Sequence, residues 1–165
     1  MSRTGRKIIA WTGHRADLFR DPDAARAAVD RTARELADAG AERFLVGGQR
    51  GVDTWAALAA IARAVPFCLI LPAAVDEFAR DWSERDRTLL LDVEAAAADV
   101  CIVAGYAERN RQLARSADVL VAVWTRTAGG GTAETLEYAR LVGTPVREIV
   151  LDPSARAHSA SGRGI

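Results

Sequence analysis

The chain has 165 residues and a mass of 17.7 kDa, the size of one ordinary domain that can bury a core without metals or disulfides. Half of the residues are hydrophobic, which excludes general disorder, and 22 basic residues balance 22 acidic ones, which disfavours nucleic-acid binding through overall basicity. No apolar run approaches the roughly 18 residues of a membrane span. The first residues contain no apolar signal segment, so we expect a cytoplasmic protein without membrane contacts.

Short apolar runs alternate with longer alanine-rich stretches that carry apolar residues at helical spacing. The six runs typical of strands are 7–11, 44–46, 67–71, 100–103, 119–124 and 146–151. The region 76–99 is expected to hold one long helix or two shorter ones. Strands that are apolar almost throughout and separated by helices predict an α/β fold. We expect a Rossmann-like, doubly wound, mostly parallel sheet of about six strands with helices on both faces.

The composition changes near residue 151. Residues 1–151 are predicted to form a single Rossmann-like nucleotide-binding domain, and the polar, Gly/Ser/Arg-rich residues 152–165 a disordered tail. Cys68 and Cys101 both lie in apolar strand-like runs, which predicts small core residues in a reducing compartment. His14 and His158 are far apart and no metal-ligand spacing occurs, so we expect no metal.

Glycine-rich loops follow the first, second and fifth predicted strands, and the carboxyl ends of parallel strands lie at one edge of a sheet. Glycine allows a ligand to approach the backbone closely, and the amino terminus of a following helix favours an anion such as phosphate. The alternative is that these glycines only form tight turns. Asp53 would cap its helix or hold a ribose hydroxyl. The candidate ligand-binding residues of the loops are Gly13, Arg15, Gly48, Arg50, Gly51, Asp53, Gly129, Gly130, Gly131 and Thr132.

Arginine supplies nearly all of the positive charge, because Lys7 is the only lysine. Arg109 is predicted near the start of the helix after the fourth strand, where a cation opposes the helix dipole unless an anion or nearby Glu108 compensates. Asn110 lies on the apolar stripe of that helix, so we expect it to hydrogen-bond inward, to backbone or to ligand. Both residues join the candidate ligand-binding set. The arginines within or beside the strand-end loops are Arg15, Arg50, Arg109 and Arg126.

The motifs of familiar nucleotide enzymes are missing: TGHR follows the first strand in place of GxGxxG, and no GxxxxGK[ST] occurs. The segment GGQRGVDTWAA, however, resembles the G-x-x-x-G-[IV]-D-x-x-A-A segment of the SLOG superfamily, which includes DprA-like, YpsA-like and Lonely-guy proteins. TGHR, ERNRQLARSADVLVAVW and GGGTAETLEYARLVGTPV are most similar to the YpsA-like branch, in order from Ile8 to about Leu151. The resemblance implies a Rossmann-like domain that binds a nucleotide or nucleotide-derived ligand over phosphate-binding glycine loops, and a homodimer.

The Lonely-guy hydrolases, which cleave the N-glycosidic bond of nucleoside 5′-monophosphates, carry a PGGxGTxxE segment and an upstream arginine. Thr135 occupies the position of the family's glutamate, and Glu134 lies one residue earlier. If this chain is an enzyme, the resemblance makes Glu134 and Arg109 its candidate catalytic residues. The residues that match the glycine segment are Gly129, Gly131 and Thr132.

Three functions remain open. The leading hypothesis is a cytoplasmic binding protein, such as a sensor, for a nucleotide or nucleotide-derived phosphorylated ligand. The second is a nucleoside 5′-monophosphate phosphoribohydrolase, and the third is DprA-like single-strand DNA binding, which the balanced charge disfavours. The expected partners are the small phosphorylated ligand and a second copy of the chain, and no cofactor is predicted beyond that ligand.

Overall fold

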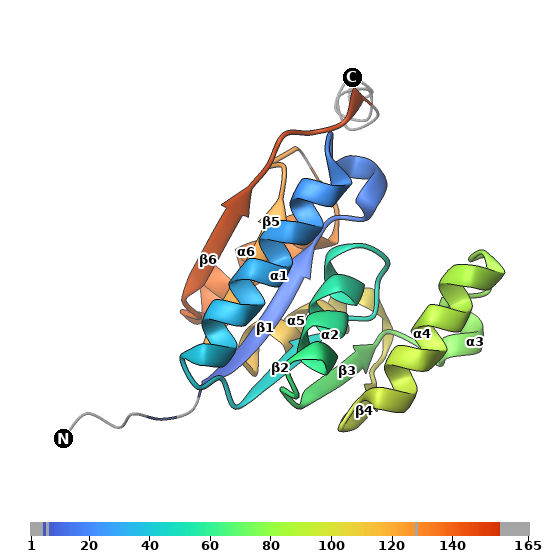
Figure 1. The fold of residues 1–165 in the computed structure, drawn as a ribbon, viewed down its shortest axis with the longest axis horizontal. Helices are drawn as coiled ribbons and strands as arrows, with labels where there is room; N and C mark the ends of the chain where they lie inside the picture. The colour runs from blue at the N-terminus through green and yellow to red at the C-terminus, as the bar shows by residue number, and fades with distance from the viewer. Residues whose placement is uncertain (1–4, 6, 128, 156–165) are drawn as a thin grey trace.

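Six parallel strands form one sheet in the computed structural model, which describes residue 5 and residues 7–127 and 129–155 (Figure 1). The strand order is β4-β3-β2-β1-β5-β6, and each neighbouring pair is parallel. The strands are β1 (Ile8–Gly13), β2 (Arg43–Val46), β3 (Phe67–Leu71), β4 (Asp99–Ile102), β5 (Val119–Trp124) and β6 (Val146–Val150). The predicted strands are therefore confirmed: β3 and β5 have the predicted bounds, and the ends of the others differ by at most two residues.

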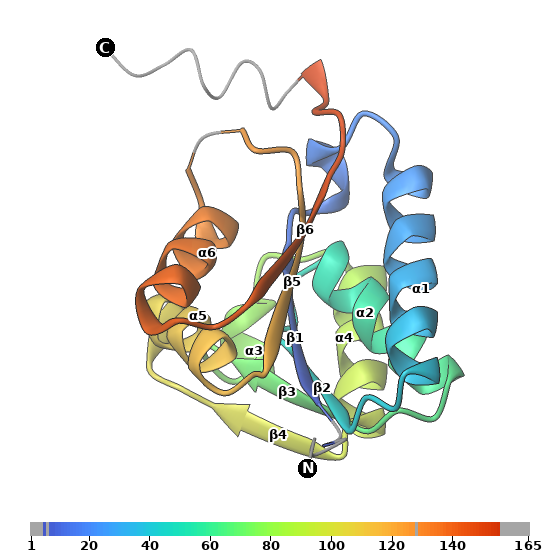
Figure 2. The same ribbon diagram turned by 90° about the vertical axis from the view of Figure 1, so that its left-hand side faces the viewer.

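Helices cover both faces of the sheet. Figure 2 shows α1, α2 and α4 on one face and α5 and α6 on the other. The helices are η1 (Ala16–Leu18), α1 (Pro22–Asp38), α2 (Val52–Ala62), α3 (Val75–Phe78), α4 (Glu84–Ala96), α5 (Gly105–Arg115) and α6 (Gly131–Val142). This is the predicted α/β, Rossmann-like fold, and the 76–99 region holds two helices rather than one. Within the described ranges, no helix combines the length and apolar character that crossing a bilayer requires.

Capping residues in the sequence set several helix ends. Asp21 precedes α1 and accepts a hydrogen bond from the Ala24 N–H at 3.0 Å, and Pro22 occupies the first turn. Ser83 caps α4 in the same way. Gly143 ends α6 in a left-handed conformation, with a φ of 80°.

The alternation of side chains along the strands divides the core between the two faces of the sheet. Ile9 and Trp11 of β1 pack with the α1/α2 side, whereas Ala10 between them packs with the α5/α6 side. Cys68 of β3 is buried, as predicted. Cys101 is exposed, so its prediction as a core residue is wrong, because β4 is an edge strand whose four residues are all exposed.

The chain after β6 returns to the loop that follows β1. The Asp152 carbonyl accepts a hydrogen bond from the Arg20 N–H, and the Ser154 N–H donates one to the Leu18 carbonyl, both at 2.9 Å. The predicted tail 152–165 thus begins with residues that contact the domain, and residues 156–165 lie outside the described part of the chain.

Candidate functional site

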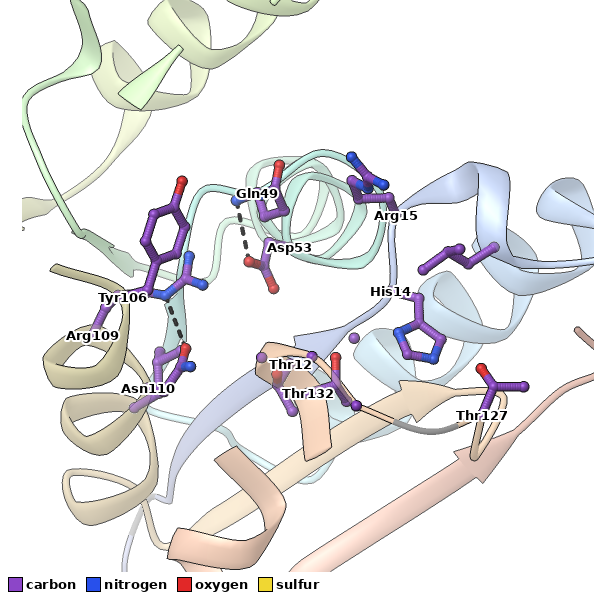
Figure 3. Close-up of a pocket in the computed structure, with 16 residues that line it drawn as sticks. Thr12, His14, Arg15, Gln49, Asp53, Tyr106, Arg109, Asn110, Thr127 and Thr132 are labelled. Atoms are coloured by element: carbon purple, nitrogen blue, oxygen red, sulfur yellow. Dashed lines mark hydrogen bonds between the residues drawn. The ribbon is translucent and has the colours of Figure 1, made fainter. Parts of the chain in front are cut away.

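A cavity of about 330 Å³ opens at the carboxyl ends of β1 and β5, where the strand order of the sheet reverses. This is the position at which doubly wound sheets bind ligands. Figure 3 shows its walls, which come from the loop after β1, the start of α2, the start of α5 and the loop that leads into α6. The lining residues are Thr12, Gly13, His14, Arg15, Leu18, Gln49, Asp53, Tyr106, Arg109, Asn110, Leu113, Thr127, Gly129, Gly130, Gly131 and Thr132.

The amino terminus of α6 forms one wall. Gly129 and Gly130 have φ angles of 83° and 89°, a left-handed region that side chains rarely adopt. Gly130 precedes the first helical residue, and no side chain of the described residues caps the helix. A Cβ atom on Gly131 would lie 3.4 Å from Nδ2 of Asn110, so the helix terminus and the Asn110 amide face the same part of the cavity.

Arg109 and Asn110 form the wall contributed by α5, and both are at least nine-tenths buried. The Arg109 guanidinium donates to the Gly47 carbonyl at 2.8 Å and to Oδ1 of Asn110 at 3.1 Å, and it lies 5.4 Å from the ring centre of Tyr106. These contacts compensate its buried charge. Glu108 is not its partner, because the Glu108 carboxylate pairs with Arg115 at 2.7 Å.

The amide nitrogen of Asn110 has no hydrogen-bond partner among the described residues. The amide oxygen is occupied by Arg109, whereas Nδ2 is buried and finds no acceptor among the described residues. A buried N–H group without a partner is costly, and such groups are rare in native proteins. The observed partner of Asn110 is the Arg109 side chain, rather than the backbone or ligand group predicted, and its amide nitrogen faces the cavity.

Asp53 contributes the acidic side chain of the cavity, from the first turn of α2. Its Oδ2 accepts the Gln49 N–H at 3.1 Å, and its Oδ1 is buried with no donor in the described part of the chain. Burial raises the pKa of the Asp53 carboxyl to about 6, although the Arg109 charge and the Gln49 hydrogen bond act in the opposite direction. Asp53 is therefore a poorly compensated carboxylate at neutral pH.

His14 lies at the opposite end of the cavity from Tyr106 (Figure 3). Its ring packs at tilted angles against Phe19 and Trp124, with centroid distances of 5.9 and 6.1 Å. Burial lowers the pKa of His14, so the imidazole is neutral at physiological pH. Its Nε2 atom has no hydrogen-bond partner in the residues that the structure describes.

Three of the predicted ligand-binding residues do not line the cavity. Gly48, Arg50 and Gly51 follow β2 in the same loop as Gln49 but do not line the cavity. A Cβ atom on Gly48 would lie 2.5 Å from a methyl group of Leu71, so this glycine allows close core packing. The remaining predicted ligand-binding residues do line the cavity.

Arg50 points into a neighbouring hollow that it shares with Arg15. Its guanidinium lies 4.8 Å from the ring centre of Trp82 and 3.9 Å from a carboxylate oxygen of Asp86. Arg126, next to the third loop, pairs with Glu148 at 3.5 Å.

The two positions compared with the Lonely-guy glutamate also lie away from the cavity lining. Glu134 is exposed and borders a shallow depression on the outer side of α5 and α6. Thr135 is fully buried, and its hydroxyl donates to the Gly131 carbonyl at 2.6 Å.

Sequence reasoning missed several lining residues because their signal is weak. His14 lies between the predicted ligand-binding residues Gly13 and Arg15, and Gln49 lies between Gly48 and Arg50. Tyr106 directly follows Gly105 at the start of α5, where a glycine beside an aromatic residue could have suggested it. The missed lining residues are Thr12, His14, Leu18, Gln49, Tyr106, Leu113 and Thr127. No cluster of three metal-binding side chains occurs in the described ranges.

Comparisons with known proteins give matches only among solved structures; no family model and no curated protein matches the chain. The molybdenum cofactor carrier protein from Chlamydomonas reinhardtii matches with a TM-score of 0.64 and 22% identity, over 96% of this chain and 86% of that one. The molybdenum cofactor binding protein from Rippkaea orientalis matches with a TM-score of 0.64 and 20% identity, over 94% and 82%. DNA processing protein A (DprA) from Streptococcus pneumoniae matches with a TM-score of 0.67 and 17% identity, over 98% and 58%.

The chain has the same Rossmann-like α/β fold as these proteins. The Rossmann-like fold that the sequence resemblance implies is thereby confirmed. The matched proteins are described as a cofactor carrier, a cofactor binding protein and a DNA-processing protein.

Proposed function

We propose that the protein binds a small nucleotide or nucleotide-derived phosphorylated ligand in the cavity between β1, β5 and α6. The observation that carries this proposal is the meeting of the α6 amino terminus with the unpartnered Asn110 amide, as far as the described residues go. Three successive glycines lead into the helix, and in the described part of the chain no side chain caps its first N–H groups. Such a terminus favours an anion, and Asn110 adds a buried donor directed to the same place.

The charges of the cavity support the same class of ligand. Arg15 and Arg109 carry positive charge and Asp53 carries negative charge, and the dipole of α6 adds a positive end. Arg109 is held by Gly47 and Asn110, so its charge is fixed in place before a ligand arrives. The cavity suits a ligand with an anionic group at one end and neutral polar groups at the other.

A phosphoribohydrolase has less support than a binding protein. That reaction needs a carboxylate at the glycosidic bond, and Glu134, the residue to which the resemblance gives this role, is exposed outside the cavity. We therefore propose binding, with release of free base from nucleoside monophosphates as the assay that would establish hydrolysis instead. The cytoplasmic location and the homodimer expected from the sequence remain predictions alongside this proposal.

Calorimetry tests the proposal. The panel holds AMP, GMP, CMP, UMP, ADP-ribose and the molybdenum cofactor, the last because two matched proteins are described as binding or carrying it. We expect saturable binding of at least one ligand. Asn110→Ala should weaken it about 10-fold or more, because a hydrogen bond to a charged group is lost. Gln112→Ala removes an amide from the same helix outside the cavity and should leave the affinity unchanged. A folded protein that binds none of these at millimolar concentration would overturn the proposal.

A further inference from the structure

Asp53 presents an acceptor to the cavity that the protein itself does not use. The residue is 5% exposed, and its Oδ2 is bonded to the Gln49 N–H while Oδ1 has no donor among the residues described. Arg109 does not donate to this oxygen, because its guanidinium donates to the Gly47 carbonyl and the Asn110 side chain. In the described part of the chain it forms no ion pair with Asp53. A buried acceptor of this kind costs free energy unless something donates to it.

The position of Asp53 defines the polarity of the cavity. Asp53 extends from α2 on one side, and Thr132 at the start of α6 lies on the other (Figure 3). A phosphate placed against Asp53 would meet a like charge, whereas the α6 terminus attracts it. The two walls therefore recognise different parts of one ligand, an anionic group at α6 and a hydrogen-bond donor at α2.

The ribose of a nucleotide carries such donors close to its phosphate. Its 2′- and 3′-hydroxyls form a rigid cis-diol, and an acidic side chain near the glycine-rich turn is a common partner of ribose hydroxyls in Rossmann-type domains. A carboxylate accepts from both hydroxyls without giving up its remaining hydrogen bond to the backbone.

We propose that Oδ1 of Asp53 accepts hydrogen bonds from the ribose hydroxyls of the ligand, so that the cavity selects ribonucleotides over deoxyribonucleotides. The inference rests on the proposed function, since it assigns the second end of the same ligand. It also separates this cavity from one that binds DNA, which lacks the 2′-hydroxyl and has its 3′-oxygen esterified.

The first test uses the unchanged protein and matched ligands. AMP, GMP, CMP and UMP are titrated by calorimetry beside their 2′-deoxy and 2′,3′-dideoxy counterparts. We expect the dideoxynucleotide of the preferred base to bind about 10- to 100-fold more weakly, the loss typical of a hydrogen bond to a charged group. Equal binding of ribo- and dideoxynucleotide overturns the inference and leaves the proposed function intact. Absence of binding by every ribonucleotide and by ADP-ribose overturns the inference, and the proposed function falls as well if the molybdenum cofactor does not bind either.

A second comparison identifies the donor. The alternative source is an exocyclic amine of the base, which AMP carries and inosine 5′-monophosphate lacks. A loss of affinity for the inosine compound together with equal binding of AMP and its dideoxy form would assign Asp53 to the base and overturn the ribose assignment. We expect the reverse pattern, in which affinity follows the hydroxyls.

Variants then connect the selectivity to Asp53. Asp53→Asn retains the shape and an oxygen for the Gln49 N–H, so we expect the ribose selectivity to fall to about 3-fold or less. Asp23→Asn makes the same change in the first turn of α1, where Asp23 is exposed, and should leave the selectivity at its wild-type value. Unchanged selectivity in Asp53→Asn would overturn the inference.

Discussion

The ionised Asp53 carboxylate lowers the stability of the folded protein. Burial raises its pKa from 3.8 to about 6, so the ionised form is less stable in the folded protein than in the unfolded chain. Neither the Arg109 charge nor the Gln49 N–H cancels this penalty. A destabilising polar residue inside a cavity is typical of a binding site, where function is retained at the expense of stability.

The pKa of Asp53 predicts how stability depends on pH. The pKa of Asp53 is higher in the folded protein than in the unfolded chain. The stability that protonated Asp53 gives the folded protein is therefore fully present below about pH 3.8 and is lost as the pH rises to about 6. As the pH rises from 4 to 7.5, the free energy of unfolding of Asp53→Asn should therefore increase relative to that of wild type by about 2 to 3 kcal/mol.

Urea denaturation of both proteins across this range measures the difference. Asp23→Asn, which neutralises an exposed aspartate, should show little pH-dependent gain of its own. A difference between Asp53→Asn and wild type that stays constant with pH would contradict the assigned pKa.

At the scale of elements, the apolar runs and the glycine-rich loops predict most of the fold and the position of the cavity. The strands could be placed because parallel strands buried on both faces are apolar almost throughout. The three loops could be placed at one edge because parallel strands end together. Six strands, helices on both faces and a strand-end cavity all follow from these two patterns.

The direction of each loop side chain could not be predicted in this way. Gln49 faces the cavity while its neighbour Arg50 stacks on Trp82, because the left-handed backbone at Gly48 and Gly51 turns the loop between them. The joint contact of Arg109 and Asn110 with a carbonyl 62 residues earlier likewise depends on tertiary packing. The sequence indicated the loops, and the fold decides which of their side chains meet.

The edge strand β4 gives a prediction for the two cysteines. Cys101 is exposed on β4, whereas Cys68 is buried on β3, where burial raises the pKa of its thiol. Reactivity follows exposure and thiolate formation. We expect Ellman's reagent to modify one thiol per chain in the folded protein and both after denaturation.

Cys101→Ser should abolish the reaction of the folded protein, and Cys68→Ser should preserve it. A folded wild type in which neither thiol reacts would contradict the exposure of Cys101 and indicate that another chain covers β4.

At the scale of the whole molecule, balanced charge is compatible with a locally positive cavity. The 22 basic and 22 acidic residues sum to zero, and many arginines are already paired on the surface. Long nucleic acid needs a continuous basic surface, whereas a single nucleotide needs only a few groups. The balanced net charge thus disfavours long nucleic acid and is compatible with a single nucleotide, a distinction that the fold alone does not make.

We expect a single-stranded DNA 20-mer to bind no tighter than about 0.1 mM at physiological salt, the weak end of non-specific binding. Fluorescence anisotropy of the labelled DNA at two salt concentrations measures this. Micromolar binding at low salt that weakens steeply as salt is added would contradict the expectation and favour DprA-like DNA binding.

The contacts of the chain after β6 have a consequence for where this domain ends. Phe19 and Pro153 pair as an isolated bridge, and the Ser154 hydroxyl donates to the Asp17 carbonyl at 2.9 Å. The segment so held carries Leu18, a wall of the cavity. A version cut at Leu151, where the polar composition begins, would release that wall, whereas one that continues through Ser154 would keep it in place. We therefore expect the shortest stable version of the domain to include residues 152–154, which follow the last apolar run.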